Sequence, residues 1–334
     1  MHPQPTHWAI RNDVSKFVES ITIVGDRGIV RRILECGTSF DLWRRAIVTR
    51  RVGKLMNNLK IGLAQTRQTA DFDANAETIL RFLEQAADKD VQILCFPETQ
   101  TVGYRVDIAE TDAPCPVDKL NELHEKVANR CREFGMACIL GTETPAAPDR
   151  SGKPYNSAIV INERGETLGV HHKTKLTPLD ALAYSPGQSI DTYELFGVPV
   201  GVVICFEAFR FAETTAECVR QGARVVFHPQ NNTTRPNDWK IPIHHAMITT
   251  RAAENTIWFA SCNACLEPHQ NSRSMVVAPD GRVHAQTELR QEELLVTDLD
   301  LSLATQAMFH FDMEDCADVL FADTVERDEF SSVL

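Results

Sequence analysis

The order of the expected elements predicts an α/β fold built on two packed sheets of mixed pairing, with helices on the outside. From about residue 58 onward, short apolar and β-branched segments alternate with segments of helical periodicity, which is the pattern of βα units. Some neighbouring strand-like segments are joined by turn sequences instead, which predicts antiparallel hairpins. Together these observations indicate mixed sheets rather than a wholly parallel one.

Strand-like and helical segments follow one another closely in the first half of this region. Apolar residues recur at the spacing of one helix face between Ile79 and Ala86. The sequence Glu-Arg-Gly at 163–165 predicts the turn of a hairpin. The expected strands are 59–65, 91–96, 136–141, 155–162 and 166–172, and the expected helices are 75–87 and 117–134.

The second half keeps the same alternation and contains no internal repeat. The apolar run GVVI before Cys205 predicts a buried strand, and Pro-Asp-Gly at 279–281 predicts a hairpin turn. The expected strands are 198–205, 223–228, 256–262, 273–278, 282–286 and 294–300, and the expected helices are 213–221 and 242–255.

Three parts of the chain differ in character: an N-terminal extension at 1–57, a domain at 58–303 and a C-terminal tail at 304–334. Residues 1–55 hold 10 Lys or Arg against 5 Asp or Glu, and Met56 reads as the natural start of a domain. The extension is either dispensable or a helical arm used in assembly. The apolar stretch 308–321 can pack across a subunit interface or on its own core.

Composition excludes several classes of protein. The net charge of −12 argues against nucleic-acid binding, which needs basic surface. No apolar run reaches about 18 residues and no signal peptide is recognisable, so we expect no membrane span. Ten scattered cysteines do not resemble a secreted disulfide scaffold, which favours a reduced, cytoplasmic enzyme.

A metal site is not expected. The His-His pairs at 171–172 and 244–245 would place their side chains on different faces of an element, so each makes a poor chelator. Cys262 and Cys265 form a solitary Cys-x-x-Cys pair, whereas structural zinc needs four ligands. His228 suggests no ligand set by itself.

Three expected strands end in reactive side chains: Glu98, Lys173 and Cys205. Reactive residues of α/β folds gather beyond the carboxyl ends of strands. A thiol needs a base to become a nucleophile, and a buried carboxyl such as Glu98 can accept its proton. Lys173 and the backbone N–H of Phe206 can stabilise an oxyanion. Each residue alone also fits a structural role, and only the set favours catalysis.

The sequence around these residues resembles the carbon–nitrogen hydrolase, or nitrilase, superfamily. CFPETQTVGY at 95–104, HHKTKL at 171–176 with AYSPG at 183–187, and GVVIC at 201–205 are similar to its three motifs, in order. The resemblance covers about 58–303 and implies a four-layer α-β-β-α sandwich, a Glu98–Lys173–Cys205 triad, no cofactor, and a homodimer or higher homo-oligomer.

The chain departs from the family pattern at several positions. Asp180 stands where many relatives carry a second glutamate, and it or Glu207 is expected to support Lys173 or the attacking water. Lys175 replaces the histidine of K-x-H-L. The segment after Cys205 is one residue longer than the common form, so Arg210 receives no substrate role.

The resemblance implies hydrolysis of a small-molecule amide or N-carbamoyl compound through a cysteine thioester, with a nitrile as the alternative substrate. Tyr104, Phe206, Asn231 and Asn232 are expected to line the substrate pocket. Three other functions remain open: a catalytically idle binding or scaffold protein, a transferase that captures the thioester with an amine, and a Cys–His protease that uses His228.

Overall fold

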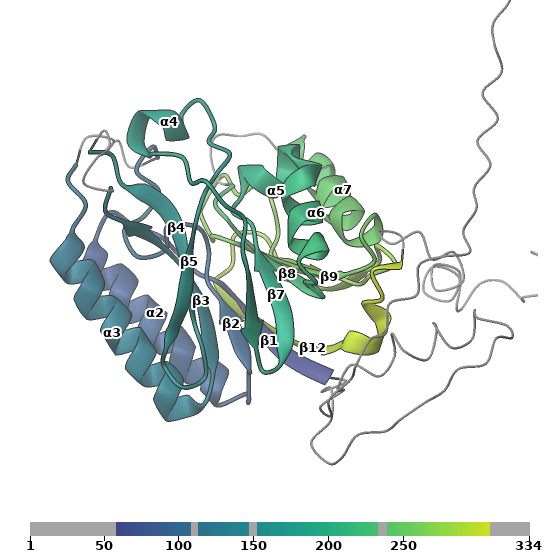
Figure 1. Cartoon of the computed structure of the whole chain (residues 1–334). Coiled ribbons are helices and arrows are strands. Elements are labelled where there is room, and N and C mark those ends of the chain that lie inside the picture. The colour runs from purple at the N-terminus through teal and green to yellow at the C-terminus, as the bar shows by residue number, and fades with distance from the viewer. Residues whose placement is uncertain (1–57, 108–112, 147–151, 233–238, 308–334) are drawn as a thin grey trace, which may run out of the picture. The chain divides into compact units, whose positions relative to one another are not determined.

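In the computed structural model, two six-stranded β-sheets form the centre of the region that the structure describes (Figure 1). The structure describes residues 58–107, 113–146, 152–232 and 239–307. The extension 1–57, including Met56, lies outside the described residues, and so does the stretch 308–334 of the expected tail.

The first sheet has the strand order β12-β1-β2-β3-β4-β5. Its bounds are β1 Asn58–Gln65, β2 Ile93–Cys95, β3 Ala137–Thr144, β4 Tyr155–Ile161, β5 Thr167–His172 and β12 Glu293–Asp300. β1, β2 and β3 pair in parallel, while β12, β4 and β5 join antiparallel. The pairing is therefore mixed, as the sequence predicts.

The second sheet has the order β11-β10-β9-β8-β7-β6. Its bounds are β6 Thr192–Leu195, β7 Val198–Val202, β8 Val225–Gln230, β9 Trp258–Asn263, β10 Met275–Val277 and β11 Val283–Gln286. β7, β8 and β9 are parallel, and hairpin-type pairs flank them on both sides. The carboxyl ends of β7 and β8 consequently lie at one edge of this sheet.

Four layers follow from the side chains that alternate along the strands. Leu59 and Ile61 of β1 belong to the core shared with the second sheet, whereas Leu94 of β2 packs with the helices outside the first sheet. The helices α2 Phe72–Ala87 and α3 Val117–Phe134 cover the first sheet. The helices α5 Phe206–Arg210, α6 Ala212–Arg220 and α7 Lys240–Ala253 cover the second sheet (Figure 1). The expected sandwich is the observed one.

Capping explains where α2 begins and where α3 ends. The Asp71 carboxylate accepts hydrogen bonds from the N–H groups of Asp73 and Ala74, so α2 begins three residues before the expected 75. α3 matches its expected bounds, and Gly135 ends it in the left-handed conformation with φ 62°.

Among the residues that the structure describes, four short elements were not predicted from the sequence pattern. They are β6, the single-turn helix α4 Asp180–Ala183, the five-residue helix α5, and the 3₁₀ turn Leu301–Leu303. β6 joins β7 through Phe196 and Gly197, which both have positive φ, as a two-residue hairpin turn requires. Phenylalanine is an unusual residue in such a turn, so the hairpin gives little sequence signal.

The strand expected at 198–205 ends earlier, at Val202, and this shortening shapes the site. Cys205 has φ 48° and ψ −104°, which no strand residue adopts. The chain turns there and enters α5 at once.

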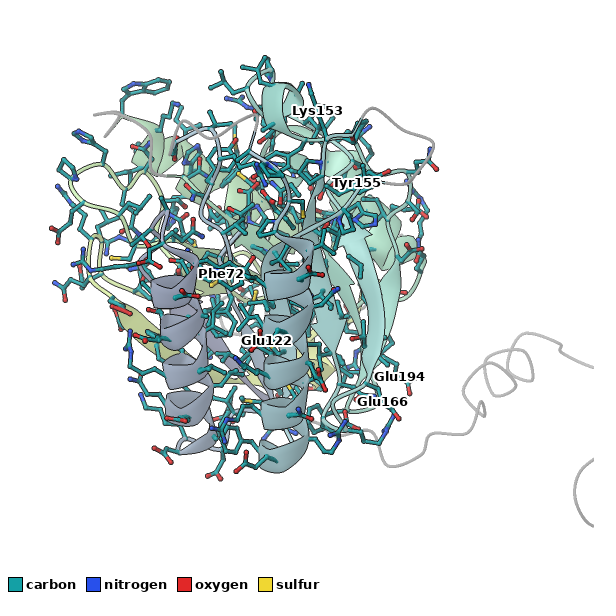
Figure 2. All side chains as sticks on the ribbon, turned by 90° about the vertical axis from the view of Figure 1, so that its left-hand side faces the viewer. Phe72, Glu122, Lys153, Tyr155, Glu166 and Glu194 are labelled. Atoms are coloured by element: carbon teal, nitrogen blue, oxygen red, sulfur yellow. The ribbon has the colours of Figure 1, made fainter. Side chains whose placement is uncertain are left out.

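The carboxyl end of β5 lies close to the turn at Cys205, because the Glu207 carboxylate accepts hydrogen bonds from the N–H groups of both Thr174 and Ile204. Figure 2 shows Glu166 and Glu194, which belong to two hairpins, at one end of the molecule, with Lys153 and Tyr155 at the other end. His172 pairs with Ser157, near Tyr155, so Lys173 follows β5 at the latter end. Within the described ranges, no helix is long and apolar enough to cross a membrane.

Candidate active site

Cys205 sits in a strained turn that backbone hydrogen bonds stabilise. Its N–H donates to the carbonyl of Pro229 at 2.9 Å, and its own carbonyl accepts a hydrogen bond from Nε2 of His228 at 3.0 Å. A non-glycine residue with φ 48° costs of order 1–3 kcal/mol and persists only where its surroundings impose it. The turn brings the thiol from the end of β7 to a position where the residue is 8% exposed.

Glu98 follows β2 and is almost fully buried. One carboxylate oxygen, Oε1, accepts from Nζ of Lys173 at 2.6 Å and from Nδ2 of Asn156 at 2.7 Å. The other oxygen, Oε2, accepts from the backbone N–H of Asn231 at 2.9 Å. These contacts hold both oxygens in fixed positions.

Lys173 follows β5, and its ammonium lies between two carboxylates. Besides Glu98, it donates to Oδ2 of Asp180 at 2.9 Å. Asp180 also accepts from the hydroxyl of Tyr104 at 2.5 Å and from the N–H of Thr177 at 2.8 Å. The aspartate in α4 thus reaches Lys173, and its second oxygen holds Tyr104.

The environment separates the proton affinities of the two carboxyl groups. Burial raises the pKa of Glu98, and the charge of Asp180 raises it further, although Lys173 opposes both. Burial would also raise the pKa of Asp180, but Lys173, Tyr104 and Thr177 lower it below its usual value. Of the two, Glu98 is therefore the group suited to accept and return a proton.

The charges of the same cluster act on the lysine and the thiol. Burial would lower the pKa of Lys173, but the negative charges of Glu98 and Asp180 raise it well above the ordinary value. Burial and the charge of Glu98 raise the pKa of the Cys205 thiol, while Lys173 lowers it. The ammonium stays charged, and the thiol needs a base to lose its proton.

Glu207 connects the turn at Cys205 to the end of β5, which Lys173 follows. Its carboxylate accepts from the N–H of Ile204 at 2.5 Å, from Nε2 of His171 at 2.8 Å, and from Thr174 N and Oγ1 at 2.7 and 2.6 Å. Burial would raise the pKa of Glu207, but His171 and these hydrogen bonds lower it to about 2. Glu207 supports the backbone on both sides, while Asp180 contacts Lys173 directly.

The two asparagines expected in the pocket lie differently. The side chain of Asn231 donates to Oε1 of Gln68 at 2.7 Å, so its amide is turned away to a buried partner. Nδ2 of Asn232 lies 3.6 Å from the sulfur of Cys205. Phe206 begins α5 and packs edge-to-face on Phe211, with ring centroids 5.4 Å apart. Its backbone N–H is one of those without an intrahelical acceptor.

Sequence reasoning gave no role to two amides that hold Glu98. Gln68 donates from Nε2 to the backbone carbonyl of Glu98 at 2.6 Å, and Asn156 donates to its carboxylate. Gln68 follows the carboxyl end of β1, so the strand-end pattern that pointed to Glu98 could have identified it. Asn156 lies inside β4, where no such signal exists.

His228 does not act as the base of a Cys–His pair in this geometry. Its Nε2 faces the backbone carbonyl of Cys205, and its Nδ1 faces Oγ of Ser261 at 2.9 Å. Burial lowers the pKa of His228 to about 3. The imidazole is engaged on both nitrogens, which argues against the protease alternative.

The remaining candidate ligands and cations also have other contacts. The His171 ring contacts Glu207, while Nδ1 of His172 lies 2.9 Å from Oγ of Ser157. In the part of the chain that the structure describes, no three His, Cys, Asp or Glu residues are grouped to hold a metal ion. Nζ of Lys175 lies 5.1 Å from the Phe211 ring, and Arg210 is exposed.

Comparison with known proteins decides the family. The family model described as carbon-nitrogen hydrolase matches residues 60–309, well over half of the chain. The chain belongs to the carbon–nitrogen hydrolase family. The resemblance of the three sequence motifs is thereby confirmed.

Several curated relatives of this carbon–nitrogen hydrolase are named as amidases. Omega-amidase NIT3 of Saccharomyces cerevisiae is 26% identical over 268 residues, which cover 74% of this chain and 88% of the relative. An (R)-stereoselective amidase of Pseudomonas sp. is 30% identical over 229 residues, covering 67% and 78%. The protein is therefore an enzyme of the amidase-type carbon–nitrogen hydrolases.

Solved structures show the same fold as this hydrolase. The NitN amidase from Neterenkonia sp. AN1 superposes with a TM-score of 0.63 at 21% sequence identity, covering 82% of this chain and 99% of that one. A glutamate-to-glutamine variant of the Nesterenkonia sp. AN1 amidase superposes equally well at 22% identity, covering 82% and 96%.

Proposed function

We propose that this hydrolase cleaves the carbon–nitrogen bond of a small-molecule amide or N-carbamoyl compound, through a thioester on Cys205. The observation that supports it best is the cluster of Glu98, Lys173 and Asp180, in which one ammonium is held by two buried carboxylates. This arrangement supplies a base of raised pKa and a fixed cation beside a strained cysteine.

In the proposed reaction, Glu98 transfers the protons. Glu98 takes the thiol proton as the sulfur of Cys205 attacks the carbonyl carbon. Lys173 and the backbone N–H of Phe206 stabilise the oxyanion that forms. Glu98 then gives its proton to the departing nitrogen, which leaves as an amine or ammonia. Finally Glu98 takes a proton from water, whose oxygen attacks the thioester carbon. The C–S bond breaks, the acid leaves, and Glu98 returns the proton to the sulfur of Cys205.

The relatives favour an amide over a nitrile. The two curated relatives named above are amidases. An N-carbamoyl compound presents the same carbonyl carbon and the same departing nitrogen, so this mechanism serves it equally well.

The decisive experiment is intact mass of the full chain after brief incubation with amides, carbamoyl compounds and nitriles. Quenching the wild-type reaction in acid should trap the thioester, whose mass identifies the acyl part, whereas Glu98→Gln lacks the base for both half-reactions and should neither accumulate an adduct nor release ammonia. Cys205→Ala should carry no adduct and release no ammonia. Cys115→Ala removes a half-buried thiol elsewhere and should behave as wild type. Hydrolysis that survives in Cys205→Ala would refute the proposal.

We also propose that the protein forms a homo-oligomer and is located in the cytoplasm. Trp239 and Ile243, at the start of α7, are 62% and 41% exposed and border a hollow of about 470 Å³ with Pro242 and Met247. An apolar surface of this kind suits a contact between two copies of the chain. We expect a dimer by light scattering that Trp239→Glu with Ile243→Asp converts to monomer. A reduced compartment would keep the Cys205 thiol active.

A further inference from the structure

Five residues form a closed ring of hydrogen bonds that begins and ends at Cys205. The contacts run from the Cys205 carbonyl to Nε2 of His228, from Nδ1 of His228 to Oγ of Ser261, and from Ser261 to Nε2 of Gln230. Oε1 of Gln230 then meets Nδ2 of Asn232, and the same Nδ2 lies 3.6 Å from the sulfur of Cys205.

The sheet register assembles this ring. His228 and Ser261 are neighbours on the parallel strands β8 and β9. Gln230 lies two residues beyond His228, so both side chains point to the same face of β8. His228, Gln230 and Ser261 are completely buried. Asn232 follows immediately after the strand, and its backbone N–H donates to Oδ1 of Asn263 at 2.9 Å.

The direction of every hydrogen bond in the ring follows from its first member. A carbonyl oxygen only accepts, so Nε2 of His228 carries a hydrogen. Burial lowers the pKa of His228 to about 3, so the ring is neutral near pH 7 and Nδ1 is an acceptor. The Ser261 hydroxyl must then donate to Nδ1, which leaves its oxygen to accept from Gln230.

The same reasoning determines which way the side-chain amides of Gln230 and Asn232 are oriented. Nε2 of Gln230 faces the oxygens of Ser261, at 2.6 Å, and Ser272, at 3.2 Å, so its oxygen faces Asn232. An oxygen of Asn232 at that place would meet another oxygen at 2.7 Å, so Asn232 presents its nitrogen. One N–H of Asn232 binds Gln230, and the second is directed at the sulfur of Cys205.

We infer that Asn232 is a catalytic residue whose side-chain N–H donates to the sulfur of Cys205 and stabilises the thiolate, in an orientation that His228, Ser261 and Gln230 impose. Asn232 contacts the reacting atom, and the other three are positioning residues. No proton moves along the ring, because the thiol proton goes to Glu98 and the N–H stays on Asn232. The inference rests on the proposed function for its catalytic meaning.

The charges around the sulfur make such a donor useful. The negative charges of Glu98 and Asp180 raise the pKa of the Cys205 thiol. The positive charge of Lys173 lowers it. A neutral N–H donor stabilises the thiolate without adding a charge that would also lower the pKa of the base. Asn232 therefore assists the step in which Glu98 removes the proton.

The test measures the thiolate directly in the full-length protein, without substrate. The rate at which iodoacetamide alkylates Cys205 is measured by peptide mass spectrometry from about pH 6 to about pH 10, a range that brackets the ordinary pKa of a thiol. Asn232→Leu removes the donor at similar volume, and we expect alkylation at pH 8 to slow by about tenfold as the pKa of Cys205 rises. Asn232→Ala serves as a second variant, and thermal unfolding checks that both fold.

A matched pair tests the ring. Ser261→Ala breaks it, whereas Ser272→Ala removes the other serine that contacts Gln230 and leaves the ring closed. We expect slower alkylation, by a few-fold, in Ser261→Ala only. An unchanged pKa of Cys205 in both Asn232 variants, or equal effects of the two serine variants, would overturn the inference. Failure of the proposed function would be recognised by a different result, namely hydrolysis that persists in Cys205→Ala.

Discussion

Lys173 and Asp180 form a buried ion pair, with Nζ of the lysine 2.9 Å from Oδ2 of the aspartate and both side chains at most 1% exposed. Because the same ammonium also binds Glu98, two carboxylates share one cation. A lone positive charge cannot neutralise both, so their proton affinities separate. This division of roles underlies the first two predictions.

Replacing Asp180 should move the acid limb of the pH profile. Asp180→Asn removes a negative charge that raises the pKa of Glu98, so that pKa falls. Glu98 must be ionised to act as the base, and the acid limb of kcat/KM should therefore shift to lower pH. The measurement is kcat/KM for the substrate found in the mass experiment. Asp298→Asn, at an exposed acid of β12, should leave the limb in place, and a shift to higher pH in Asp180→Asn would contradict the assignment.

Removing the shared cation should destabilise the protein. Lys173→Met leaves Glu98 and Asp180 buried without their counter-ion, which we expect to cost about 3–5 kcal/mol in the free energy of unfolding at pH 7. Urea unfolding measures this difference. Lys175→Met, two residues away and over the face of Phe211, should cost less than about 1 kcal/mol. Equal losses in the two variants would show that the buried pairs contribute little.

The ionised Glu207 carboxylate should make the free energy of unfolding depend on pH in the acid range. Its folded pKa of about 2 lies below its value of about 4.3 in unfolded chains. The stability that it contributes is therefore complete above about pH 5 and is lost as the pH falls toward 2. We expect Glu207→Gln to be less stable than wild type at pH 7, with a difference that shrinks steadily below about pH 5.

The control for this prediction is Glu213→Gln, at an exposed position in the first turn of α6. Urea unfolding at several pH values should show no comparable convergence for that variant. A constant difference between Glu207→Gln and wild type from pH 7 to pH 3 would mean that the side chain acts through packing and not through its charge.

Arg105 should stabilise the loop that carries Tyr104. Its guanidinium binds both carboxylate oxygens of Glu143, at 2.5 and 2.7 Å, and the pair is almost fully buried. Arg105→Met leaves Glu143 charged and unpaired, so we expect a loss of about 3–5 kcal/mol in unfolding free energy and lower activity. Lys126→Met breaks an exposed pair with Glu122 and should cost less than about 0.5 kcal/mol. A loss in Lys126→Met as large as that in Arg105→Met would contradict this expectation.

Local patterns predicted those parts of the site that lie where a strand ends. Glu98 and Lys173 each follow an apolar strand, and strand direction alone places such residues at one edge of a sheet. Cys205 was expected at the end of a strand, but it lies three residues beyond β7 in a strained turn. No residue type signals that conformation, because the contacts that impose it come from β8.

Contacts between distant segments account for what the sequence pattern did not predict. Asn231 and Asn232 are adjacent and chemically identical in the sequence. One donates to Gln68, 163 positions away, and the other meets Cys205, 27 positions away. Which asparagine reaches the sulfur depends on the register in which β8 pairs with β9. The local sequence does not predict that register.

By itself, the sequence determined the α/β class, the order of most elements, and the acid, cation and thiol at three expected strand ends. These follow from hydrophobic periodicity and strand polarity, which are properties of short segments. Only the tertiary structure decided that Asp180 holds Lys173 while Glu207 braces the backbone, and that His228 faces a carbonyl instead of the thiol. Those roles depend on burial and on hydrogen-bond direction, which arise only when separate strands are brought into register.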